Sequence, residues 1–315
     1  MAKRGFHQTG EVIAREITNP NPVGISFKET DSLHSTESKL LCCHFHSQRK
    51  LLATAGHERK VVIWDLENDK VNFGEGHADV ITDVCFKPNS TVFATSSFDR
   101  TVMIWDAAKP SNPFQNLVGH GEHVMSTDFH PMKVGLLSSC DSNDEIRLWN
   151  VSEGDCKLIL KGGSRQVRFQ PGLGNLLASS TGNTINIFDL ETNNIQQQLQ
   201  GHARDIRSFC WDMSGNYLAS VSEDSARIWS ISNEKCICEL VSSDHMFQSC
   251  TFRPGYAMVL VIGSNELLEL WNPIFQRNRT RAYLAHDGLI PSLAVSHEHG
   301  IIASVSHDQW IKIWR

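Results

Sequence analysis

Residues 77–106 read HADVITDVCFKPNSTVFATSSFDRTVMIWD. Three short runs in this stretch, ITDVCF, FATSSF and TVMIWD, are rich in β-branched and apolar residues, and turn-forming segments separate them. Runs of this kind, bounded by Pro, Asn or Asp, are typical of half-buried β-strands. The stretch therefore predicts at least three strands joined by tight turns.

The aromatic residue near the end of this stretch recurs along the whole chain. Similar runs end in aromatics at spacings of 41, 44, 39, 41, 42 and 43 residues. These aromatics are Trp64, Trp105, Trp149, Phe188, Trp229, Trp271 and Trp314. A second motif, a dipeptide that ends in His, precedes five of these aromatics by 26 to 29 residues. Its copies are Gly76-His77, Gly119-His120, Gly201-His202, Asp244-His245 and Ala285-His286. Two signals with one period indicate a repeat architecture.

These motifs resemble the WD-repeat family, whose repeats carry Gly-His near the start and Trp-Asp at the end. Trp64-Asp65 and Trp105-Asp106 match both letters of the second motif. The resemblance implies an all-β fold, a seven-bladed β-propeller over residues 22–315, with residues 1–21 as a flexible N-terminal tail. Arg315 directly follows the last Trp, so the seventh repeat lacks an outer strand. We expect the alternating stretch at residues 23–30 to supply it and close the ring.

The repeated His and Trp residues have a structural interpretation. In WD-repeat proteins a His, a Ser or Thr, an Asp and the Trp form a buried hydrogen-bonded chain, which suits the donors and acceptors of these side chains. Three repeats carry the full set: His77, Thr95, Asp99, Trp105; His202, Ser220, Asp224, Trp229; and His286, Ser304, Asp308, Trp314. The others are incomplete, with Glu58, Asn143 and Asn265 at the expected Asp positions and Gly163, Gly182 and Phe188 in the fourth. We interpret these residues as structural and expect no catalytic Ser-His-Asp group.

Composition narrows the possible functions. A net charge of 29 − 35 = −6 argues against a surface for direct nucleic-acid binding. The nine Cys residues lack two pairs at zinc-site spacing, so we expect no metal. No apolar run approaches the roughly 18 residues of a membrane span. The chain also lacks phosphate-binding, dinucleotide-binding and nucleophile-elbow motifs, so we expect no enzyme activity, no cofactor and no small-molecule substrate.

Recognition of proteins is the remaining function class. Loops entering the first strand and turns between the second and third strands cluster on one face of a propeller, and Arg and aromatic residues anchor interfaces. We expect this face to bind partners through His57, Arg59, Phe98, Arg100, Glu122, His123, Arg165, Arg204, Asp205, Phe247, His307 and Gln309.

Longer stretches, among them SKLLCCHFHSQRKLLATAGHERKVVIW and LASVSEDSARIWS, resemble the propeller of plant LEUNIG-type transcriptional co-repressors, relatives in role of Groucho and Tup. The irregular repeat that ends in Phe188 and the short turn at residues 222–225 coincide as well. The resemblance implies a nuclear, non-catalytic adaptor that docks DNA-bound transcription factors and co-regulator proteins or peptides. The cytoplasm is the alternative location.

Two other functions remain open. One is a generic WD-repeat adaptor, such as a ubiquitin-ligase substrate receptor. The other is a competitor of longer family members, because those carry an N-terminal dimerisation and adaptor-binding region, whereas about 20 residues precede the first expected strand here.

Overall fold

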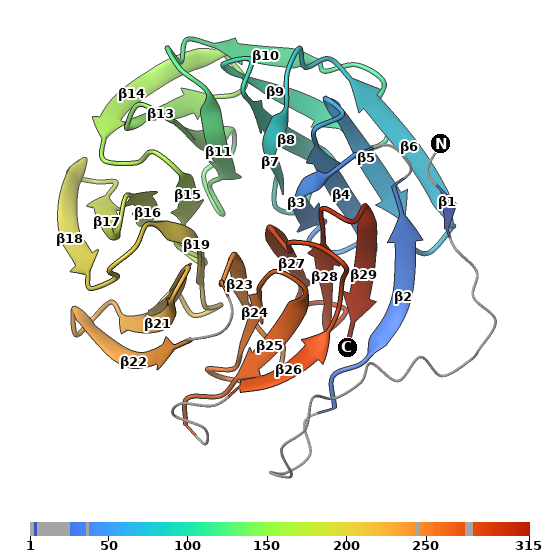
Figure 1. Cartoon of the computed structure of the whole chain (residues 1–315). Coiled ribbons are helices and arrows are strands. Elements are labelled where there is room, and N and C mark those ends of the chain that lie inside the picture. The colour runs from blue at the N-terminus through green and yellow to red at the C-terminus, as the bar shows by residue number, and fades with distance from the viewer. Residues whose placement is uncertain (1–2, 5–25, 36–37, 243–245, 275–279) are drawn as a thin grey trace.

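Seven antiparallel sheets surround a central axis in a computed structural model of the chain (Figure 1). The structure describes residues 3–4, 26–35, 38–242, 246–274 and 280–315. Each sheet is one blade, and its strands run from an inner strand beside the axis to an outer strand at the rim. The predicted all-β, seven-bladed propeller is confirmed.

The strands follow one another in chain order within each blade. The first blade comprises β3 (Leu40–Phe45), β4 (Leu51–Gly56), β5 (Lys60–Asp65) and β6 (Lys70–Glu75). The second comprises β7 (Ile81–Phe86), β8 (Val92–Ser97), β9 (Thr101–Asp106) and β10 (Gln115–Val118). The third comprises β11 (Val124–Phe129), β12 (Leu136–Asp141), β13 (Glu145–Asn150) and β14 (Asp155–Lys161).

The remaining blades follow the same order. The fourth comprises β15 (Gln166–Phe169), β16 (Leu176–Thr181), β17 (Thr184–Asp189) and β18 (Asn194–Gln200). The fifth comprises β19 (Ile206–Trp211), β20 (Tyr217–Ser222), β21 (Ser225–Ser230) and β22 (Lys235–Val241). The sixth comprises β23 (Ser249–Phe252), β24 (Leu260–Gly263), β25 (Leu267–Trp271) and β26 (Thr280–Leu284). The seventh comprises β27 (Ser292–Ser296), β28 (Ile301–Val305) and β29 (Trp310–Trp314), with β2 (Glu29–His34) and β1 (Lys3–Arg4) outside them.

The ring is closed by β2, which pairs antiparallel with β29 of the seventh blade, as Figure 1 shows. This confirms closure by an N-terminal strand, but the strand lies later in the chain than the expected residues 23–30. The strand spans residues 29–34 because Leu33 enters the apolar core between the seventh and first blades, beside Ile311. Residues 23–25 lie outside the described residues, as does most of the predicted tail, where Lys3 and Arg4 pair with β2 as β1.

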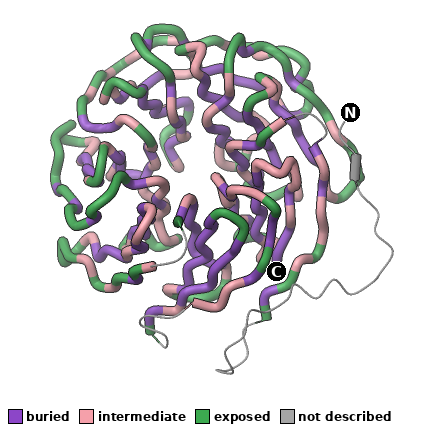
Figure 2. Tube along the Cα trace, viewed as in Figure 1, coloured by how far each residue is buried: buried purple, intermediate pink, exposed green. Residues whose placement is uncertain are grey.

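Apolar clusters fill the spaces between neighbouring blades. The cluster between the first and second blades includes Ile63, Phe93 and Trp105, and the rings of Phe93 and Trp105 stack with their centroids 6.0 Å apart. Burial is concentrated in the strands nearer the axis, whereas outer strands and turns are exposed (Figure 2). Side chains of β14 alternate between exposed and half-buried, as expected for a strand covered on one face. The stability of the ring thus resides in inter-blade cores, and the turns are available for other roles.

Candidate recognition surface

Antiparallel order within the blades defines two faces of the ring. The turns between second and third strands lie at the same end as the connections from one outer strand to the next inner strand, and we call this end the upper face. The turns between inner and second strands lie at the opposite end with the turns between third and outer strands, and we call it the lower face. The side chains expected to bind partners come from upper-face segments.

The second blade shows how the repeated polar residues are used. His77 Nε2 lies 2.7 Å from Thr95 Oγ1 and its Nδ1 lies 2.7 Å from Asp99 Oδ2. Trp105 Nε1–H donates to the same Thr95 oxygen at 2.8 Å. Burial alone would raise the pKa of Asp99, but the hydrogen bond and charge of His77 hold that pKa well below its usual value. The chain of contacts joins the upper-face loop to the second and third strands.

The seventh blade repeats this arrangement. His286 lies 2.7 Å from Ser304 Oγ and 3.0 Å from Asp308 Oδ2, and Trp314 Nε1–H donates to Ser304 Oγ at 2.9 Å. Burial opposes ionisation of Asp308, but the hydrogen bond and charge of His286 lower its pKa to about 2.

The fifth blade departs from the expected set. His202 Nε2 lies 2.7 Å from Ser220 Oγ, and the same oxygen accepts from Trp229 Nε1–H at 2.9 Å. The other ring nitrogen of His202, Nδ1, lies 2.8 Å from Ser225 Oγ. Asp224, expected there, accepts instead from Ser222 Oγ at 2.8 Å. The turn is one residue shorter than in the second blade, so the next residue occupies the position facing the imidazole.

The third blade corrects a second expectation. His120 lies 3.0 Å from Asp141 Oδ2 and 2.6 Å from Ser139 Oγ, which also accepts from Trp149 Nε1–H at 2.8 Å. The acid is therefore Asp141 at the end of β12, and Asn143 instead donates its backbone N–H to Asp141 Oδ1 at 3.0 Å. This blade, expected to be incomplete, has the full network.

In the first and sixth blades the described residues show the following. In the first, Trp64 Nε1–H donates to Thr54 Oγ1 at 2.8 Å, and Glu58 lies in the turn that follows β4. Asn265 lies between β24 and β25. The Asp244-His245 pair lies outside the described residues.

The fourth blade uses different bonds in the same place. Ser179 Oγ and Asn186 Nδ2 both donate to the backbone carbonyl of Gly162, at 2.5 and 2.7 Å. A Cβ atom at Gly163, where five other repeats carry His, would lie 2.8 Å from Ile146 and Ser179 side chains. The space for an imidazole has closed, and the carbonyl of Gly162 takes over as the shared acceptor.

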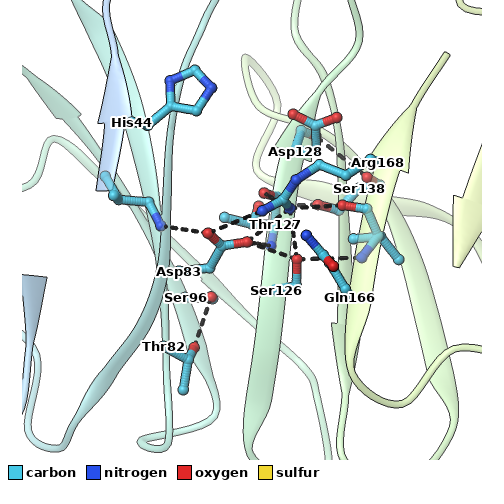
Figure 3. Close-up of polar contacts among 12 residues, drawn as sticks. His44, Thr82, Asp83, Ser96, Ser126, Thr127, Asp128, Ser138, Gln166 and Arg168 are labelled. Atoms are coloured by element: carbon cyan, nitrogen blue, oxygen red, sulfur yellow. Dashed lines mark hydrogen bonds and ion pairs between the residues drawn. The ribbon is translucent and has the colours of Figure 1, made fainter. Parts of the chain in front are cut away.

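A cluster of charged and polar side chains on the inner strands was not anticipated from the sequence, and Figure 3 shows its contacts. Arg168 on β15 forms two hydrogen bonds with Asp83 on β7, at 2.8 and 3.3 Å, and also donates to Ser126 Oγ on β11 at 2.8 Å. The pair spans the third blade and links residues 85 positions apart. A charged residue within an apolar inner-strand run, as in ITDVCF and QVRF, was the available signal.

Polar side chains of the inner strands also bind the backbone of the next blade. His44 Nδ1 accepts from Phe86 N–H at 3.2 Å, and Asp128 Oδ2 accepts from Phe169 N–H at 2.8 Å (Figure 3 labels both acceptors). Burial raises the pKa of Asp128 to about 7, against the effect of Arg168, and lowers the pKa of His44 to about 4. These groups hold neighbouring inner strands together. Because they make contacts within the ring, we assign partner recognition to the upper and lower faces.

One group of side chains has the composition of a metal site. The ligand atoms of His120, Asp141 and Glu145 lie within 4.8 Å of one another. However, the first two bond each other, and Glu145 pairs with Arg147 at 2.6 Å and Lys161 at 3.5 Å. Internal hydrogen bonds and ion pairs account for this group.

The expected partner-binding residues divide by exposure. Eight are exposed: His57, Arg59, Arg100, Glu122, His123, Arg165, Arg204 and Asp205. Phe98, His307 and Gln309 are half-buried. The expectation for Phe247 is wrong, because its side chain is fully buried and packs with Val221 and Leu240 between the fifth and sixth blades.

Neighbouring upper-face segments contact one another. His123 Nδ1 lies 2.7 Å from the carbonyl oxygen of Phe98, and the two rings lie 4.6 Å apart. Arg165 donates to the carbonyl of Arg207 at 3.1 Å. Arg100 adopts a left-handed conformation with φ of 71°, and its backbone N–H bonds the Ser97 carbonyl at 3.2 Å, which closes the turn and leaves its side chain exposed. The upper face is therefore built on fixed turns.

The blade geometry and the repeated His and Trp residues together define the class: a seven-bladed propeller built from sequence repeats. In the described part of the chain, no helix has the length and apolar character needed to cross a membrane. The sequence model of the family described as "WD domain, G-beta repeat" matches residues 27–65, 69–106, 111–150, 193–230 and 277–315. The chain belongs to the WD-repeat family, and the matched ranges leave out residues 151–192 and 231–276, which hold most of the fourth and sixth blades.

Several curated proteins are similar to the chain. "Transcriptional corepressor LEUNIG_HOMOLOG" of Arabidopsis thaliana is 46% identical over 92% of this chain and 37% of its own length. "Nuclear distribution protein PAC1" of Arthroderma benhamiae is 30% identical over 76% of the chain and 59% of its own. "WD repeat-containing protein 26 homolog" of Arabidopsis thaliana is 26% identical, with 76% and 42% covered. The chain thus spans just over a third of the co-repressor's length, and the resemblance to its propeller is confirmed.

Proposed function

We propose that the chain is a non-catalytic scaffold that acts in the nucleus as a transcriptional co-repressor or co-regulator. Its upper face docks DNA-bound transcription factors and co-regulator proteins or peptides. The observation that carries this proposal is the 46% identity with a transcriptional co-repressor over 92% of the chain. The generic WD-repeat adaptor is the alternative that an experiment must distinguish.

The positions of the chemically reactive side chains support a scaffold. His77 is buried, and each ring nitrogen already has a partner in Asp99 or Thr95. A catalytic base must reach a proton of its substrate. Side chains enclosed by their own network stabilise the blade and leave recognition to exposed turns.

The chemistry of the upper face supports protein docking. Arg100, Arg204 and Arg59 are exposed, while the net charge of the chain is −6, so these guanidinium groups form local basic positions on an acidic molecule. Arg is enriched among residues that dominate binding energy in protein interfaces. The fixed turn at Arg100 reduces the conformational entropy lost on binding.

The test is affinity capture from an Arabidopsis thaliana nuclear extract with wild-type chain and an Arg100→Glu/Arg204→Glu variant. A matched control, Lys109→Glu/Lys235→Glu, makes the same charge change at exposed positions near the lower face, one in a turn and one at the start of β22. We expect identified co-repressor components with wild type and control, and their loss with the upper-face variant. Capture of ubiquitin-ligase subunits in their place, or equal capture by all three proteins, would overturn the proposal.

A further inference from the structure

The lower face carries a group of exposed apolar side chains beside the axis. Met132, Val134, Leu173 and Met213 are between 65% and 85% exposed. They lie in the turns between inner and second strands of the third, fourth and fifth blades, so they occupy three consecutive blades. We call these four side chains the lower ledge.

The turns that carry the lower ledge are fixed against one another. A Cβ atom on Gly174 would lie 2.6 Å from the His130 ring, so the turns of the fourth and third blades are in contact. Gln170 Nε2 donates to the carbonyl of Gly215 at 2.8 Å and joins the fourth-blade turn to the fifth.

Hydrogen bonds within the turns add to this rigidity. His130 Nδ1 accepts from the backbone N–H groups of Met132 and Lys133, at 3.0 and 2.8 Å. In the fifth blade, Asp212 accepts from the backbone N–H groups of Ser214 and Tyr217, at 3.1 and 2.8 Å. The ledge is thus a preformed surface, and a ligand would not have to order it.

Cations outnumber acids in the lower-face turns between inner and second strands. The equivalent turns of the first four blades contain Arg49, Lys50, Lys87 and Lys133 and no Asp or Glu. Asp212 in the fifth-blade turn accepts from backbone N–H groups of its own turn, and Glu298 is the acid of the seventh-blade turn. Acidic residues such as Glu67, Glu153 and Glu191 belong to turns between third and outer strands, farther from the axis.

An apolar surface bordered by cations fits one kind of partner. Met side chains are flexible and polarisable, so they adapt to apolar groups of different shape. Lys133 and Lys87 can pair with carboxylates, and the acidic outer turns would repel a carboxylate-bearing segment toward the axis. A nucleic acid would use the cations but would leave the apolar side chains uncovered.

We propose that the lower ledge, with Lys133 in the third-blade turn and Lys87 in the adjoining second-blade turn, binds an acidic amphipathic peptide segment of a partner protein. Apolar side chains of that segment contact Met132, Val134, Leu173 and Met213, and its carboxylates pair with the bordering cations. This second docking face lies opposite the upper face and does not depend on the proposed function. A chain with both faces in use could hold two partners at once.

The test measures binding of a short fluorescein-labelled peptide composed of Asp, Leu and Phe, by fluorescence anisotropy. The ledge variant Leu173→Asp/Met213→Asp is compared with Val118→Asp/Val241→Asp, which changes side chains of similar exposure on outer strands. We expect the ledge variant to bind about tenfold more weakly and the control to bind as wild type does. Lys133→Glu should weaken binding and reduce its dependence on salt.

Three results would overturn the inference: no binding by wild type, equal binding by the ledge variant, or equally tight binding of a peptide in which Lys replaces Asp. Displacement of the peptide by a single-stranded oligonucleotide at equal concentration would assign the surface to nucleic acid and overturn it as well. The upper-face variant Arg100→Glu/Arg204→Glu should keep full peptide affinity. Failure here is therefore separate from failure of the proposed function.

Discussion

The second and fourth blades have the same strand order and different internal bonds. In the second, a Thr hydroxyl joins His77 to Trp105, and Asp99 holds the other side of the imidazole. In the fourth, the carbonyl of Gly162 receives two side-chain donors, and Phe188 fills the place of the Trp. Both sheets keep four strands in the ring. Each blade has one polar atom in this position that bonds two side chains. The comparison teaches that this atom can be a side-chain hydroxyl or a backbone carbonyl oxygen.

The largest expected effect comes from removing the Trp of the second blade. Trp105→Ala empties a fully buried site and removes the donor to Thr95, so we expect a loss of about 3–5 kcal/mol in the free energy of unfolding. Trp105→Phe imitates the fourth blade and should cost only about 1–2 kcal/mol. Urea unfolding followed by circular dichroism measures both. A Trp105→Phe variant as stable as wild type would contradict the assigned role of the indole N–H.

A smaller effect is expected when the fourth blade is changed toward the second. Gly163→Ala places a Cβ within 2.8 Å of Ile146 and Ser179 side chains, and overpacking of this kind costs about 1–3 kcal/mol. Gly121→Ala is the matched control, because a Cβ there meets nothing within 4 Å. The measurement is again urea unfolding. A Gly163→Ala variant as stable as the control would show that the space at this position is not closed.

The fifth blade offers a comparison of the group that faces the imidazole. Burial, helped by Arg227 and opposed by Asp224, lowers the pKa of His202 to about 4. Its folded pKa is thus below the unfolded value of about 6.5, so the stability from neutral His202 is present above that value and is lost as pH falls toward 4. Ser225→Asp places a carboxylate beside Nδ1 and should raise the pKa of His202.

The readout is the change in unfolding free energy between neutral pH and about pH 4.5. We expect that change to be about 1 kcal/mol smaller in Ser225→Asp than in wild type, and an NMR titration of His202 reports the pKa directly. His44, which also has a lowered pKa, is common to both proteins and cancels in the difference. If the free energy of unfolding changed equally with pH in both proteins, the proposed effect of residue 225 on the pKa of His202 would be refuted.

The smallest effect on stability is expected from exposed residues outside the networks. Arg100→Glu/Arg204→Glu should change the free energy of unfolding by less than about 0.5 kcal/mol, because both side chains are exposed. Thermal unfolding checks this. A loss comparable to that of Trp105→Phe would show that the upper-face arginines belong to the architecture.

Periodicity made the seven blades and the closed ring predictable, because each repeat carries its own strand and turn signals. Single-residue changes in turn length were not predictable in the same way. One such change placed Ser225, and not Asp224, beside the imidazole of the fifth blade. In the third blade the turn is as long as in the second, and Asp141, two residues before Asn143, faces the imidazole from the end of β12. A shift of one residue leaves the period almost unchanged and alters which side chain faces inward.

Contacts between different repeats were the other limit on prediction from sequence. Phe247 is buried because residues of two blades enclose it, which no local pattern indicates. The pairing of Asp83 with Arg168 joins positions 85 residues apart across the third blade. The sequence marks both as charges within apolar runs, but only the arrangement of blades around the axis brings them together.

The central claim is that the His and Trp networks hold the ring and the upper face binds partners. The most direct test measures the unfolding midpoint and the capture of co-repressor components, per mole of folded protein, for His77→Ala and Arg100→Glu/Arg204→Glu. We predict that His77→Ala lowers the midpoint and keeps full capture, whereas the arginine variant keeps the midpoint and loses capture. Loss of capture in His77→Ala with full capture by the arginine variant would contradict the account.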